Sequence, residues 1–358
     1  MAGVAVVAAA AMATATRGAK RLRAVQTAHF VLELEDLLKE IFRHLDLGVD
    51  ARAMRVCRQW RRVLAAAVAS RLTLTLDDYV AGDSTGLSLP HGVGMMPRHY
   101  EGMARLLVAD TRNDRLVTFT AGEKLCREIE CPEIMVRPRT LTLTDEDLYI
   151  TSFTQNNIIR IRYDDILTRN AERAPNCADV VSTEGDLWSP EGVCIHRGRL
   201  YCCSSKHNEV VSYTLQEETP LPVKHRFGAD RLRDPTGIAW HAGYLYVADR
   251  GHDRLAVFSS SVGTFHREIR GFRQPVGVAF HHGRMYVSEQ RRVVAMAPAG
   301  GAPLAVYSAP NCSLAHLCAG PRHVYVADCR NHVVHRLAVW RDAEGAEAPR
   351  STASSPAK

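Results

Sequence analysis

The side chains that could hold a metal ion are one glutamate and a set of histidines. Glu191 stands between a proline and a glycine, where a carboxylate could bind Ca²⁺ or Zn²⁺. Its counterparts Thr236 and Val276 add no charge, so a turn residue is the preferred interpretation. Several histidines lie in turns that are far apart along the chain, which favours a surface role for His207, His241, His252, His281, His282, His323, His332 and His335. No metal site or cofactor is therefore predicted.

Basic side chains recur in or beside one type of turn, and they are the next candidates for binding. If these turns share one face of the fold, the cations form a ring that could bind RNA phosphates or an acidic protein surface. The alternative is a solvated rim balanced by Asp114, Asp249, Asp253, Glu289 and Asp328. The basic residues are Arg112, Arg115, Lys206, Arg250, Arg254, Arg291, Arg292 and Arg330.

These turns follow a short apolar strand that recurs six times. Tyr246-Val247-Ala248-Asp249 is the clearest copy, and an Asn- or Asp-containing turn comes after it. Successive copies are 39 to 52 residues apart, a period that fits the four-stranded blades of a β-propeller. The copies begin at Leu107, Tyr149, Tyr201, Tyr246, Tyr286 and Tyr325.

Each copy has upstream elements that would position the turn. Three copies are preceded by a Pro-x-Gly sequence, interpreted as a turn, at Pro190, Pro235 and Pro275. An apolar run and a tight hairpin such as His241–Gly243 come next. The second and sixth copies lack the Pro-x-Gly sequence, and the first copy is weak upstream of Leu106, so the repeats are expected to span about 97–340.

The repeats resemble the NHL family. The fourth copy matches that pattern nearly throughout, at 234–240, 246–249 and 253–258. This resemblance implies a mainly β fold, a six-bladed NHL-type β-propeller. Some NHL propellers bind single-stranded RNA, and some six-bladed propellers are metal-dependent lactonases or esterases. Both functions are kept as alternatives.

A closed ring needs a partner for its last strand edge. After the sixth copy the apolar pattern ends at Trp340, which leaves room for only three strands. Residues 71–76 alternate apolar and polar side chains, as an added strand would. Leu72, Leu74 and Leu76 are therefore predicted to supply the missing strand, and the propeller domain is placed at 71–340.

Residues 33–70 have a helical pattern instead. Apolar residues recur there at spacings of three and four, first from Leu34 to Leu45 and then from Ala53 to Ala67. Two or three helices of this size cannot bury so much apolar surface alone, so they need a partner. That partner is either another protein or the side of the propeller.

The helical segment resembles the F-box, on Asp36–Leu45 and Val56–Leu64. That family binds a Skp-type adaptor, which connects to a cullin and its RING partner. The resemblance implies a non-catalytic substrate receptor of an SCF-type E3 ubiquitin ligase, whose propeller binds a target protein and no small-molecule substrate. The expected adaptor contacts are Leu37, Leu38, Ile41, Phe42, Leu45, Val56, Cys57, Trp60 and Leu64.

Composition fits this division of the chain. Of 358 residues, 46% are hydrophobic, and the net charge of +6 is too small for a dedicated nucleic-acid binder. Ten cysteines without a Cys-x-x-Cys pair favour reduced thiols and a cytoplasmic or nuclear location. An Ala-rich, acid-free leader at 1–32 leaves organellar targeting open, and it and the tail at 341–358 are expected to be disordered. No apolar run is long enough to span a membrane.

Overall fold

The computed structural model describes residues 72–80, 86–96, 106–120, 125–131, 134–163, 179–216, 218–320 and 323–341. Thr73–Val339 form one compact unit. The predicted leader at 1–32 and helical domain at 33–70, with its nine expected adaptor contacts, lie outside the described residues, as does nearly all of the predicted tail. Within the described part, no helix is long and apolar enough to cross a membrane.

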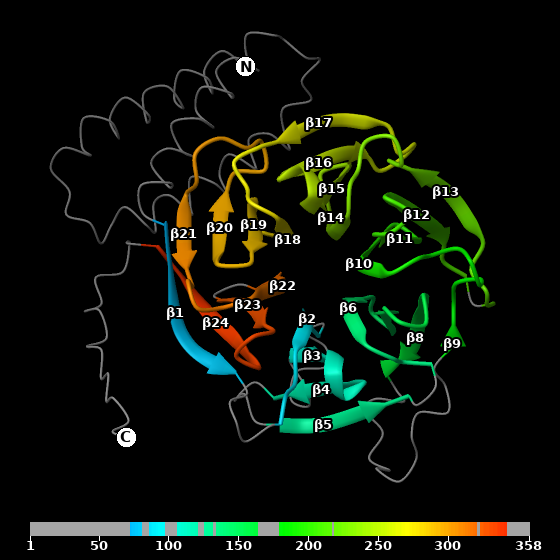
Figure 1. Cartoon of the computed structure of the whole chain (residues 1–358), viewed down its shortest axis with the longest axis horizontal. Coiled ribbons are helices and arrows are strands. Elements are labelled where there is room, and N and C mark those ends of the chain that lie inside the picture. Colours follow the sequence, from blue (N-terminus) through cyan, green and yellow to red (C-terminus); the bar gives the residue numbers. More distant parts are fainter. Residues whose placement is uncertain are drawn as a thin grey trace, which may run out of the picture. The chain divides into compact units, whose positions relative to one another are not determined.

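Six four-stranded sheets form a ring, so the predicted six-bladed β-propeller is confirmed (Figure 1). The first three blades are β2 (Pro90–Met95), β3 (Leu106–Asp110), β4 (Arg115–Phe119) and β5 (Leu125–Glu130); β6 (Pro138–Leu143), β7 (Asp147–Ser152), β8 (Asn157–Arg162) and β9 (Asp179–Val180); and β10 (Pro190–His196), β11 (Arg199–Ser204), β12 (Glu209–Thr214) and β13 (Val223–Phe227). The others are β14 (Pro235–His241), β15 (Tyr244–Asp249), β16 (Arg254–Ser259) and β17 (Phe265–Ile269); β18 (Pro275–His281), β19 (Arg284–Glu289), β20 (Arg292–Met296) and β21 (Ala305–Ser308); and β22 (Leu314–Ala319), β23 (His323–Asp328), β24 (Val333–Arg341) and β1 (Leu72–Val80).

The second strand of each blade is buried on both faces, because neighbouring blades pack against both sides of each sheet. This explains the continuous apolar runs in the sequence. All five residues of β3 are buried, for example, and all but the first residue of β11. Between the first two blades, Leu107 and Leu116 share one apolar cluster with Leu148, Ile150 and Ile159. The core is therefore a set of layers between blades.

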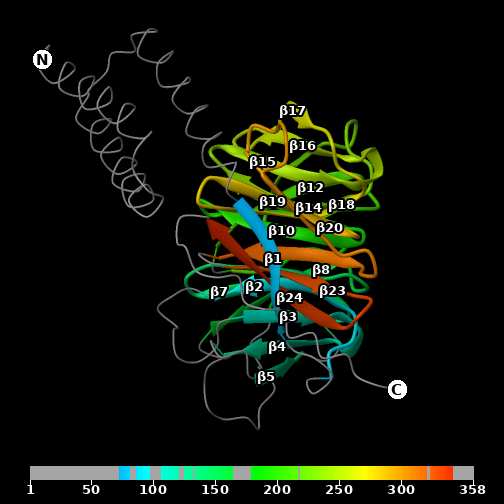
Figure 2. The same cartoon turned by 90° about the vertical axis from the view of Figure 1, so that its left-hand side faces the viewer.

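The last blade takes its outermost strand from the N-terminal side of the chain. The sheet order is β1-β24-β23-β22, with β1 lying beside β24 in both views (Figures 1 and 2). Residues 71–76 were expected to supply the outermost strand of this blade. The structure has a strand there, which continues to Val80. Its apolar face is incomplete, because Leu74 is buried whereas Leu76 is 37% exposed. Arg336 of β24 donates to Asp77 of β1 over 2.8 Å.

Two expectations about the repeats are wrong. The first blade begins at Pro90, ahead of the expected start near residue 97, and Pro90-His91-Gly92 is a further Pro-x-Gly sequence. The Pro-x-Gly sequences are also not turns. Each is the beginning of an innermost strand, with an irregular register against the second strand just after the proline, as between Pro190 and Val193. This irregularity is a β-bulge. A β-bulge keeps the strand paired but changes the direction of the side chains next to the proline.

Adjacent blades are also joined by a recurrent hydrogen bond. In five of the six blades, a left-handed residue in the turn after the second strand accepts the N–H of the residue before the next blade's first strand. The five bonds join Asp114 to Arg137 (2.7 Å), Asn156 to Ser189 (2.8 Å), Asn208 to Asp234 (2.8 Å), Asp253 to Gln274 (2.7 Å) and His332 to Leu89 (2.9 Å).

Candidate functional site

The six innermost strands bring their second and third residues to the centre of the ring. Strand pairing aligns these positions, since each first residue lies opposite the last residue of its neighbouring strand. The second positions are His91, Arg139, Glu191, Thr236, Val276 and Ala315, and the third are Gly92, Thr140, Gly192, Gly237, Gly277 and His316. The ring therefore collects charged and imidazole side chains from four different blades.

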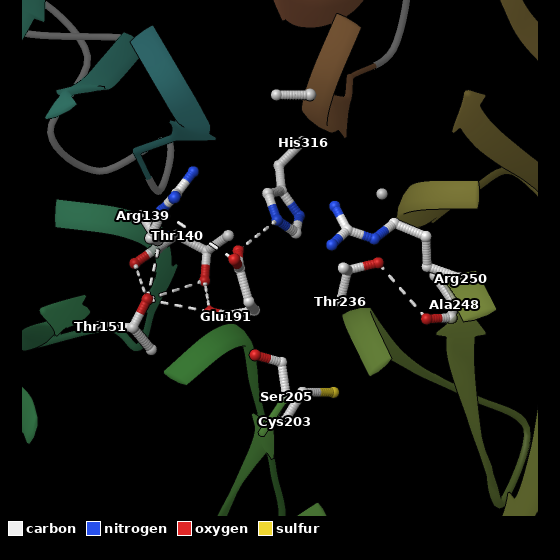
Figure 3. A network of polar contacts seen from close by, with 12 residues as sticks. Arg139, Thr140, Thr151, Glu191, Cys203, Ser205, Thr236, Ala248, Arg250 and His316 are labelled. Carbon is white, nitrogen blue, oxygen red and sulfur yellow. Dashed lines mark hydrogen bonds and ion pairs between the residues drawn. The ribbon is translucent and has the colours of Figure 1, made fainter. Parts of the chain in front are cut away.

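The third position is usually glycine because neighbouring backbones approach closely there. A Cβ at Gly237 would lie 2.5 Å from the carbonyl oxygen of Val276. The two exceptions, Thr140 and His316, contribute polar side chains to the centre. Thr140 donates a short hydrogen bond to the backbone oxygen of Glu191, which Thr151 also contacts at 2.9 Å (Figure 3). These bonds fix the backbone that carries the Glu191 carboxylate.

Glu191 lies between His316 and Arg139, and Figure 3 shows the three side chains facing one another. Its Oε2 is 3.8 Å from Nε2 of His316, and its Oε1 is 3.9 Å from Nε of Arg139. The rings of His91 and His316 have centroids 5.2 Å apart. Glu191 and His316 are each only 7% exposed. The interpretation of Glu191 as a turn residue is thus wrong, because it is a buried residue of β10.

Burial and mutual contact set the protonation states of this cluster. Burial lowers the pKa of His91 well below its ordinary value, and the Arg139 guanidinium lowers it further. Burial also lowers the pKa of His316, although Glu191 opposes this effect. For Glu191, burial acts to raise the pKa, but His316 and Arg139 outweigh it and hold the pKa below its ordinary value. At neutral pH the site therefore combines two neutral imidazoles with one ionised carboxylate.

The cluster borders two unlike cavities. One cavity of about 190 Å³ is polar, and its lining includes Lys206, Arg250 and Asp234 as well as His91 and Glu191. Arg250 donates to Asp234 over 2.8 Å at its edge. The other cavity, of about 470 Å³, is lined mainly by apolar side chains of the innermost strands and by His316. The cluster is thus reached from a cationic side and an apolar side.

One nitrogen each from His91 and His316 and one oxygen of Glu191 lie within 4.8 Å of one another. Two imidazoles and a carboxylate are a donor set that Zn²⁺ accepts in proteins. The same groups could move a proton, because a neutral imidazole beside a carboxylate is a general base. The Arg139 guanidinium would stabilise negative charge formed there.

A second group of potential ligands lies in the closing blade, at Cys312, Asp328 and His335. His335 Nε2 is 3.1 Å from Asp328, and its Nδ1 is 3.0 Å from the hydroxyl of Tyr307. Burial raises the pKa of Cys312 to about 12, with Asp328 adding to the effect, so the thiol is protonated at neutral pH. These groups satisfy one another and form a structural network.

The predicted cationic rim is strongly interleaved with carboxylates. Half of its members form ion pairs, at distances of 2.7 to 2.8 Å: Arg115–Asp110, Arg250–Asp234, Arg254–Asp249 and Arg292–Glu289. The other four, Arg112, Lys206, Arg291 and Arg330, are exposed. Only Lys206 and Arg250 of the eight line the polar cavity. This arrangement favours the balanced rim over a continuous cationic ring.

Sequence reasoning missed two of the three potential metal ligands at the centre. Aligning the repeats on their prolines would have placed His91 beside Glu191. The sixth repeat has Leu314 in place of the proline, so His316 could not be aligned in that way. A Gly-x-Ser-x-Gly run at 82–86 was also overlooked. Its residues 82–85 lie between β1 and β2, outside the described part of the chain.

No protein-family model matches the sequence, and no curated protein matches it. Among solved structures, a catalytically inactive virginiamycin B lyase from Staphylococcus aureus with quinupristin is similar, at 11% identity and a TM-score of 0.54 over 75% of this chain and 99% of that one. A streptogramin B lyase has 10% identity and a TM-score of 0.54 over 76% and 99%. A chain of a nidogen/laminin complex has 15% identity and a TM-score of 0.51 over 62% and 81%. At these identities the likeness shows the propeller fold alone.

Proposed function

We propose that the protein is the target-binding subunit of an SCF-type cullin-RING ubiquitin ligase. The observation that carries this proposal is that all four strands of every blade come from residues 72–341, while an F-box-like pattern precedes them. The ring has its own closing strand in β1. It needs no strand from residues 33–70, so in this proposal the apolar pattern of that segment serves adaptor binding.

In this proposal the two parts of the chain have separate roles. Ile41, Phe42 and Trp60 would be buried against a Skp-type adaptor, since aromatic and aliphatic anchors dominate such interfaces. The propeller would hold the target, with Lys206 and Arg250 receiving an acidic group at the polar cavity. The protein would act by proximity, because a bound target lysine meets the charged conjugating enzyme at a high effective concentration.

Replacing Ile41 by aspartate is expected to reduce recovery of Skp-type adaptor and cullin to background in an affinity pull-down. A buried, unpaired carboxylate at the centre of the interface would cost several kcal/mol of binding free energy. Lys39→Asp is the matched control, since residue 39 lies off the apolar face and should leave recovery unchanged. Absence of adaptor and cullin from the wild-type pull-down would reject the proposal.

A second candidate function is catalysis in the channel, favoured by the convergence of Glu191, His91 and His316. The substrate class would be lactones or esters, whose carbonyl carbon a bound water can attack while a general base takes the proton of that water. Wild-type protein with added Zn²⁺ is expected to hydrolyse members of a lactone and ester panel. Glu191→Gln should lower kcat at least about 100-fold, because general-base catalysis contributes that much. Equal turnover by both proteins would exclude this site.

A further inference from the structure

We propose that His91, Glu191 and His316 bind a divalent ion of the Zn²⁺ class in the central channel, and that this ion holds a small oxyanion from the polar cavity. The inference depends on neither proposed function, since a receptor and an enzyme could both have this site. Its ligands come from β2, β10 and β22, so the ion would tie together three blades of the ring.

The first support is a set of buried polar atoms that make no hydrogen bond. Among the described residues, no hydrogen bond reaches Nδ1 of His91, Oε2 of Glu191 or Nε2 of His316. A buried polar atom without a partner costs about 1–3 kcal/mol, so native proteins rarely keep several together without a bound group. Glu191 and His316 are more than nine-tenths buried, which restricts bulk water as that partner.

The second support is distance. Two ligands placed about 2.1 Å from a tetrahedral Zn²⁺ lie roughly 3.4 Å from each other. Oε2 of Glu191 and Nε2 of His316 are 3.8 Å apart, so a few tenths of an ångström of side-chain rotation would suffice. The pairs formed with the nitrogen of His91 lie within the same 4.8 Å limit. The set has the mixed N and O donors that Zn²⁺ accepts.

The protonation states agree with metal binding. Metal ions bind neutral imidazole and ionised carboxylate. Burial lowers the pKa of both His91 and His316, and His316 and Arg139 hold the pKa of Glu191 low against the effect of burial.

The net charge of the site indicates that the fourth ligand is an anion. A dication with one carboxylate keeps a net positive charge, and Arg139, Lys206 and Arg250 add three positive charges against the single further carboxylate of Asp234 in the cavity lining. Arg139 is directed away from direct ligation, with its guanidinium carbon 4.3 Å above the ring of Phe153. An anion must balance these charges, and the 190 Å³ polar cavity has room for a group of the size of phosphate. The open coordination position would therefore take an oxyanion, which Lys206 and Arg250 would contact.

The test is a titration of the full chain, first stripped with a chelator, with Co²⁺ as a visible stand-in for Zn²⁺. We expect one equivalent of Co²⁺ to bind with the intense absorption of a four- or five-coordinate site, and Zn²⁺ to displace it. Glu191→Gln should weaken binding at least about tenfold, and His316→Ala should abolish it. His225→Ala is the matched control, since His225 lies exposed on the outermost strand β13.

Inorganic phosphate is the probe for the anion. Adding it should shift the Co²⁺ spectrum of the wild type, and Lys206→Ala should weaken this shift without reducing metal binding. Absence of saturable Co²⁺ binding, or unchanged binding in folded Glu191→Gln protein, would overturn the metal site. A thiolate-to-cobalt band that disappears in Cys312→Ser would place the ion in the closing blade and also overturn it. A spectrum unaffected by phosphate would overturn the oxyanion.

Discussion

Replacing Gly237 by alanine is expected to lower the free energy of unfolding by at least about 3 kcal/mol. The added Cβ would lie 2.5 Å from the carbonyl oxygen of Val276 and 2.9 Å from Cα of Gly277. Both atoms belong to the backbone of the next innermost strand, β18. A flexible side chain could move aside, but this backbone is held by its own blade, so two blades would have to separate. Urea unfolding followed by circular dichroism measures the loss.

Gly198→Ala is the control for Gly237→Ala, because it introduces backbone strain without crowding. Gly198 has a φ of +69° in the hairpin after β10, and a Cβ there would meet nothing within 4 Å. Alanine at that position should cost about 1 kcal/mol, the usual penalty for a left-handed residue with a side chain. If Gly237→Ala costs no more than Gly198→Ala, close approach between blades does not explain the glycines at the ring centre.

Replacing Asp328 by asparagine is expected to cost about 2–4 kcal/mol at neutral pH and to flatten the acid limb of the stability curve. Asp328 is fully buried and accepts hydrogen bonds from the N–H groups of Ser313, Arg330 and Asn331. Burial acts to raise its pKa, but hydrogen bonds from His335, Ser313, Cys312 and Asn331 outweigh it and hold the pKa well below the ordinary value.

The direction of the pH effect follows from this low pKa. An unfolded aspartate titrates near pH 3.9, so below that value the unfolded chain binds a proton that the folded chain still excludes. The contribution of Asp328 is therefore complete above about pH 5 and decreases as the pH falls through 4 and below. Unfolding free energies at several pH values check this, with exposed Asp230→Asn as control. An acid limb that is equally steep in Asp328→Asn would contradict the assignment.

The repeats allowed much of the fold to be predicted, because each blade repeats its own local pattern. Tyr246, Val247 and Ala248 and their equivalents pack between two blades and must be mostly apolar, so that pattern is visible without a structure. The first blade was placed late because a ten-residue connection separates β2 from β3, which hid the Pro90 repeat. The closing strand could be expected from the edge that the sixth repeat leaves open.

The site was harder to predict because it depends on the ring. His91, Glu191 and His316 are separated by 100 and 125 residues, and each is atypical of its own repeat. Their proximity arises only when the innermost strands converge, which no local pattern reports. Most of the other innermost strands have glycine at the position of His316, so the repeat pattern assigned no role to its imidazole. The carboxylate was noticed, but without its histidines it resembled an isolated turn residue.

The partnership of β1 with β24 has a consequence for synthesis of the chain. Asp77 and Arg336, which form a hydrogen bond between these strands, are 259 residues apart. At about 5–20 residues per second, a ribosome needs roughly 10–50 s to make the second strand after the first. During that time β1 is a nascent strand whose partner does not exist, and its open edge can pair with other chains. Any chain that stops before β24 keeps this edge permanently, so premature termination should produce aggregates in place of a smaller propeller.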